Sequence, residues 1–151
     1  MLASRVVLLV VTAWVGSLWT VGYLVAPTLF ATLADRALAG TIAGRLFRVE
    51  AWLTLACGLV LLGMFLLSGA VEEVRRRRQL VAIVVAMLAC TAIGFFALQP
   101  FMADLRASAG PGRVMDADAR ARFGLLHGVA SALYLIQSLL GVVLLLRVRL
   151  R

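Results

Sequence analysis

The sequence predicts an all-α integral membrane protein, a bundle of four transmembrane helices, on three observations. Hydrophobic residues make up 64% of the 151 residues, and the mean hydropathy of +1.05 is far above that of water-soluble domains. No ten-residue segments of alternating hydrophobicity occur, which excludes a membrane barrel. Four stretches without Asp, Glu, Lys or Arg each reach the roughly 20 residues that a helix needs to cross the hydrocarbon core. They are residues 6–34, 51–71, 79–103 and 123–146.

We expect a single domain over residues 1–151, with helices at about 5–32, 41–70, 78–104 and 117–148. The first stretch follows Arg5 and could be taken for a secretory signal, but it is too long and lacks a small-x-small cleavage site. We therefore retain it as a transmembrane helix.

The connections between these helices look ordered. Helical spacing of Leu38, Ile42 and Leu46 indicates that the second helix starts well before the bilayer or is preceded by an interfacial helix. The fourth helix is expected to begin at an N-cap, either Asp116 or Asp118.

Charge is concentrated at the ends of the apolar stretches. The formal net charge is +8, and all fifteen basic residues are arginines. Without a basic groove with interleaved aromatics, this pattern indicates membrane lipids as partners and no nucleic acid. The dense cluster of residues 75–78 shares a side with both termini, so the positive-inside rule predicts a multi-pass protein of the cell membrane with both termini in the cytoplasm.

Helical-wheel positions predict an inward face for three helices. On the fourth helix it is the face of His127, and the leucines lie opposite. The inward residues expected on the first helix are Thr12, Gly16, Trp19, Thr20, Tyr23, Pro27 and Phe30, with Trp14 and Leu18 facing lipid. Those on the second helix are Ala43, Phe47, Glu50, Thr54, Cys57 and Leu61, and those on the fourth are Arg120, Phe123, Gly124, His127, Ser131, Tyr134, Ser138 and Gly141.

Several inward polar residues are predicted to converge at one depth, near the non-cytoplasmic end. They are expected to form one polar pocket, since unpaired polar groups are costly in a membrane. The pocket residues are His127, Glu50, Tyr23, Gln99, Ser131, Trp19 and Pro27.

These residues also have structural interpretations. His127 either takes part in function or makes a structural hydrogen bond to Tyr23, Gln99 or Ser131. Glu50 is expected at the membrane boundary, where it could pair with Arg120 or Arg122. Pro27 is interpreted as the breaker at a helix end. Ser131 lies one turn from His127, without the third group that a catalytic triad needs.

Three segments carry a family resemblance. "WVGSLWTVGYLVAPTLF", "AGTIAGRLFRVEAW" and "RFGLLHGVASALYLI" resemble the transmembrane-protein-205-like family, also catalogued as domain of unknown function 4149. The Phe-x-x-x-His-Gly-x-x-Ser pattern from Phe123 to Ser131 is the most specific part. The resemblance implies an integral membrane protein with four spans, and it implies no reaction.

A second likeness is to CopD-type copper-resistance proteins and HemJ-type protoporphyrinogen oxidases. It rests on Trp-x-Gly at residues 14–16 and Pro-x-Leu-Phe at residues 27–30, but Val7 stands where those families place a histidine. It implies haem or copper as a cofactor held by His127. A separate thioether and thiol path for copper would use Met64, Met87, Cys57 and Cys90, which lack CxxC or MxxM clustering and are better interpreted as packing residues.

The sequence thus predicts a membrane protein without a cofactor or metal site, which binds or passes a small solute, an ion or a lipid group, or assists another membrane protein. We favour a non-enzymatic role, with a homo-oligomer or a partner membrane protein as further possibilities. The alternative is a haem- or copper-binding redox protein that uses the lone histidine, His127.

Overall fold

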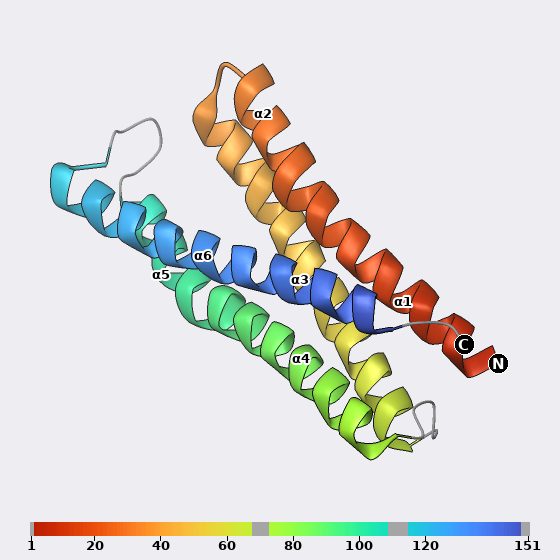
Figure 1. Cartoon of the computed structure of the whole chain (residues 1–151). Coiled ribbons are helices and arrows are strands. Elements are labelled where there is room, and N and C mark those ends of the chain that lie inside the picture. The colour runs from red at the N-terminus through yellow and green to blue at the C-terminus, as the bar shows by residue number, and fades with distance from the viewer. Residues whose placement is uncertain (1, 68–72, 109–114, 149–151) are drawn as a thin grey trace.

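The computed structural model describes residues 2–67, 73–108 and 115–148, and these form four long helical spans (Figure 1). The first consists of α1 (Leu2–Trp19), a π-helical segment (Thr20–Val25) and α2 (Ala26–Thr32). The second is α3 (Arg36–Leu67). The third consists of α4 (Val74–Ala92), a second π-helical segment (Ile93–Leu98) and α5 (Gln99–Ser108), and the fourth is α6 (Ala117–Arg147).

All four spans are long and apolar enough to cross a membrane. The chain is therefore an all-α, multi-pass membrane protein, as the composition predicts. The helices pack in a ring in which α1 contacts α3, α3 contacts α4, α4 contacts α6, and α6 contacts α1. The start of α1, the end of α3, the start of α4 and the end of α6 lie at one end, which we call the terminal end (Figure 1).

The helix ends differ from the expected bounds by a few residues. α3 starts at Arg36 instead of 41, because the Asp35 carboxylate accepts from the backbone N–H groups of Ala37 and Leu38, at 2.8 and 3.1 Å. α4 starts at Val74, so the arginine cluster lies within its first turns. Asp116 is the N-cap of α6 and accepts from Ala119 at 2.6 Å, which selects it over Asp118. The expected end of the second helix at 70 lies outside the described residues.

The packed hydrophobic core occupies the half of the bundle nearer the terminal end. Large side chains from all four helices meet there and exclude lipid, and Trp14 is fully buried. The core residues are Val7, Val11, Trp14, Val15, Leu18, Leu61, Phe65, Leu80, Val84, Met87, Leu144 and Val148. Met64 packs against this core, as do Cys57 and Leu88.

Toward the opposite end, the α1–α3 pair and the α4–α6 pair diverge (Figure 1). Each diverging pair contains one π-helical segment, and each segment ends two residues before a proline, Pro27 or Pro100. Proline lacks the N–H of an ordinary helix bond, and its ring crowds the carbonyl four residues earlier, so the turn before it widens. We expected Pro27 to end its helix, and this is wrong. The widened turn lets the helix continue to Thr32.

The predicted inward face of the first helix is wrong over α1. Trp14 and Leu18 are buried, whereas Thr12 and Gly16 are exposed. The large residues fill the core in this half, and the π-helical segment changes the face that follows it, so Tyr23, Pro27 and Phe30 do turn toward the space between the pairs. The predicted face of α3 is confirmed, with Glu50, Thr54 and Leu61 buried.

Candidate functional site

A cleft of about 610 Å³ lies between the two diverging helix pairs, on the side of the packed core that faces away from the terminal end. Most of its lining is apolar or aromatic, and a few polar side chains project into it. The polar residues are Glu50, Thr54, Thr91, Gln99, Arg106, His127, Ser131, Tyr134 and Gln137. The aromatic residues besides Tyr134 are Tyr23, Phe30, Phe47 and Phe95.

The structure brings six of the seven proposed pocket residues to this cleft: Tyr23, Pro27, Glu50, Gln99, His127 and Ser131. Trp19 is not among the lining residues. It is 47% exposed, and its ring meets Tyr23 edge-on at 6.4 Å.

The connected polar group that we expected is not formed among the described residues. No hydrogen bond joins His127, Glu50, Tyr23 and Gln99, because the diverging helices hold these side chains apart across the cleft. Ser131 donates to the backbone carbonyl of His127 at 2.8 Å, and not to its ring. Among the described residues, the His127 side chain therefore does not form the structural hydrogen bond that we considered.

The polar residues also do not share one depth. The rings of Phe47 on α3 and Tyr134 on α6 meet edge-on. Glu50 follows Phe47 by three residues, whereas His127 precedes Tyr134 by seven, so the two side chains differ in depth by about 15 Å of helical rise. α3 begins earlier than expected, so Glu50 falls near the middle of its span. It forms no ion pair with Arg120 or Arg122, and its position makes it a deeply placed carboxyl group.

The end of the cleft next to the core is called its floor. Two polar contacts between helices lie there on the α1–α3 side. The Ser17 hydroxyl donates to Glu50 Oε1 at 3.1 Å, and the Trp14 indole N–H donates to Thr54 Oγ1 at 2.9 Å. Glu50 is 5% exposed. Both contacts link α1 to α3, so this pair is held together by hydrogen bonds where the core gives way to the cleft.

A matching contact links α4 to α6 on the other side of the floor. The Thr91 hydroxyl lies 3.1 Å from Gln137 Oε1, and both side chains are buried. Gln137 is 3% exposed, and its Nε2 has no hydrogen-bond partner among the described residues. The sequence analysis missed both residues, although a glutamine inside an apolar span was a usable indication.

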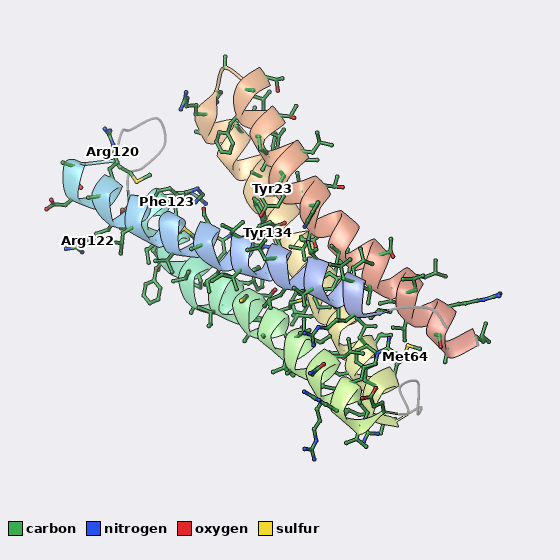
Figure 2. All side chains as sticks on the ribbon, in the orientation of Figure 1. Tyr23, Met64, Arg120, Arg122, Phe123 and Tyr134 are labelled. Atoms are coloured by element: carbon green, nitrogen blue, oxygen red, sulfur yellow. The ribbon has the colours of Figure 1, made fainter. Side chains whose placement is uncertain are left out.

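Tyr134, near the middle of α6, lines the cleft and contacts both helices of the α1–α3 pair (Figure 2). Its hydroxyl donates to the Leu18 carbonyl at 2.6 Å, and its ring meets Phe47 edge-on at 5.3 Å and Tyr23 at 6.2 Å. The ring lies directly against Gly22, which has no side chain to displace it. Tyr134 thus joins three helices at the boundary between core and cleft.

The end of the cleft away from the core is called its mouth. There a guanidinium group stacks on an aromatic ring, and that ring stacks on the imidazole of His127. The Arg106 guanidinium lies 4.8 Å from the centre of the Phe123 ring, and the Phe123 and His127 rings are nearly parallel at 6.0 Å. Phe123 lies with Arg120 and Arg122 toward the open end of α6 (Figure 2). The mouth is therefore basic and aromatic, as expected where a span meets the membrane interface.

The fold and the cleft together define a four-helix multi-pass membrane protein with a cleft between its helix pairs. Residues 9–111 match the family described as Domain of unknown function (DUF4149), and the chain belongs to this family. The match covers α3 and α4 but ends before α6, which carries His127 and Gln137. Neither the comparison with curated proteins nor that with solved structures gave a match.

Proposed function

We propose that this protein is a non-enzymatic binding protein of the cell membrane, which holds a small lipid-like molecule in the cleft. The observation that carries the proposal is the cleft itself. Its volume of about 610 Å³ falls within the range of roughly 300–1,000 Å³ that is typical of small-molecule sites. A mainly apolar lining with a few polar groups suits a molecule with an apolar body.

The position of the cleft supports a ligand that comes from the membrane. The cleft lies between helices that cross the bilayer, so an acyl or isoprenoid chain can occupy it without leaving an apolar environment. Phe30, Phe47 and Phe95 offer contact surface for such a chain.

We also propose that both termini lie in the cytoplasm, which places the mouth of the cleft on the non-cytoplasmic side. The arginine cluster at residues 75–78 supports this orientation, because such clusters are retained in the cytoplasm. A cleft that holds a small solute or an ion instead of a lipid chain would give alkane labelling in the test below that Gly44→Leu does not change.

The test is photolabelling of the full chain in lipid nanodiscs with a diazirine-bearing long-chain alkane, followed by peptide mapping. We expect labelled residues on the cleft walls. Gly44→Leu should reduce this labelling several-fold, because Gly44 lines the cleft and has open space where a side chain would project. Gly63→Leu is the matched control on the same helix, since Gly63 also has open space but does not line the cleft. Equal labelling of both variants and the wild type would refute the proposed function.

A further inference from the structure

One polar atom of the buried Gln137 amide finds no hydrogen-bond partner among the described residues. The Thr91 hydroxyl can bond one end of the amide, and Nε2 at the other end has no partner among the described residues. If the amide is turned over, the carboxamide oxygen becomes the unpaired end instead. In either orientation, a buried polar atom remains unsatisfied at a residue that lines the cleft, and such atoms are rare without a ligand or a water.

Glu50 lies across the floor from Gln137 at the same depth. Phe47 on α3 and Tyr134 on α6 meet edge-on, and both helices run from the mouth toward the terminal end. Glu50 follows Phe47 by three residues, and Gln137 follows Tyr134 by three residues, so each lies about 4.5 Å deeper than that contact. The floor therefore presents a carboxyl group and an unsatisfied amide on opposing helices.

We propose that the floor of the cleft is a hydrogen-bond site for the hydroxyl group of a lipid alcohol. This inference rests on the proposed binding function and names the class of its ligand. A hydroxyl group both donates and accepts, so it can satisfy whichever end of the Gln137 amide is unpaired and can also bond the Glu50 carboxyl group. The terminal torsion of glutamine is broad, and its rotation turns the amide toward the cleft without moving α6.

The charge distribution disfavours an anionic head group at this depth. The arginine among the lining residues is Arg106, and it contacts Phe123, which lies fourteen residues or about 21 Å of helical rise from Gln137. A phosphate or carboxylate at the floor would face Glu50 without a cation beside it. An uncharged hydroxyl has no such cost, and its apolar chain then runs along the aromatic walls toward the mouth.

The experiment compares three photoactivatable probes that share one diazirine-bearing alkyl chain and end in a methyl, a hydroxyl or a carboxylate group. Each is titrated against the full chain in nanodiscs. In Gln137→Met, we expect the apparent affinity for the alcohol to fall about five- to tenfold, the loss of one buried hydrogen bond, with the alkane unaffected. Gln79→Met is the matched control, because Gln79 lies near the start of α4 and does not line the cleft. It should retain the affinity for the alcohol.

A second measurement separates ligand binding from a structural role. Since one end of the amide is unsatisfied in the empty protein, Gln137→Met should leave the melting temperature of the ligand-free protein unchanged or raise it. Alcohol binding that does not depend on Gln137, or a carboxylate probe that binds more tightly than the alcohol, would overturn the inference while the binding function stands. Failure of all three probes to label the cleft would refute the binding function itself.

Discussion

The ring of Tyr134 occupies the space where a side chain of Gly22 would project, and the Tyr134 hydroxyl donates to Leu18 one turn earlier on the same helix at 2.6 Å. A methyl group at position 22 would displace this ring, which Phe47 also holds by an edge-on contact. The arrangement explains why a glycine stands inside a transmembrane helix at this point.

We predict that Gly22→Ala lowers the free energy of unfolding by about 1–3 kcal/mol, the usual cost of overpacking a close contact. Thermal unfolding in detergent measures the change. Gly16→Ala is the control on the same span: nothing lies near the position of its Cβ, and alanine is the better helix former by about 1 kcal/mol. If both variants melt like the wild type, Tyr134 is not held as described.

The contact between Trp14 and Thr54 gives a second prediction. Thr54→Val keeps the shape of the side chain but removes the acceptor of the indole N–H, which is fully buried. We expect a loss of about 1–3 kcal/mol, because an unpaired donor is left in the core. Thr41→Val serves as the comparison, since Thr41 is exposed and bonds only the carbonyl of its own helix at Ala37. A loss of the same size in both variants would point to helix propensity and not to the buried bond.

The exposed position of His127 gives a third prediction. Its ring stacks on Phe123 and forms no side-chain hydrogen bond among the described residues, so His127→Leu should leave the melting temperature nearly unchanged. Photolabelling of the cleft at equal protein level then shows whether the histidine contributes to binding at the mouth. A clear fall in melting temperature would show that the residue is structural.

An absorbance scan of the purified protein tests the haem alternative. We expect no Soret band, because Val7 stands where the haem-binding families place a histidine and His127 is the single histidine of the chain. Metal analysis of the same sample tests for copper. A Soret band that is lost in His127→Leu would establish the redox alternative instead.

The orientation is tested by reporter fusions after Arg78 and after Arg151. Both should report the cytoplasm, because residues 75–78 form the densest group of positive charge beside a span. Replacing these four arginines with glutamine should weaken or reverse the orientation. A non-cytoplasmic signal from either wild-type fusion would show that the proposed orientation is wrong. The position of the cleft within the bundle does not depend on that orientation.

The sequence predicts the fold well because each span must be apolar over its whole length. Composition and stretch length alone indicate four helices, and with an even number of spans, the residues near one set of ends must come together. This reasoning brings Glu50, Gln99 and His127 to one cleft. It misplaces their depth, because α3 extends beyond the apolar stretch to the cap at Asp35.

The helical wheel could not place Gln137 at the floor of the cleft. Ten residues at 100° each place Gln137 about 80° from His127, outside the inward face we defined. The helix pairs diverge, so the face that meets other helices near the terminal end differs from the face that lines the cleft. The first helix shows the same effect: its inward face changes across the widened turn before Pro27, a change that a uniform helical period cannot represent.

The core and the cleft lie in opposite halves of the bundle. The protein therefore presents a different surface to each monolayer of its membrane. In one monolayer, lipid tails meet the outer surface of helices whose interior is closed by the core, which includes Val11, Trp14 and Leu144. In the other, they meet an opening between the helices. Under the proposed function, a lipid-like ligand would therefore reach the cleft from this second monolayer and not from the other.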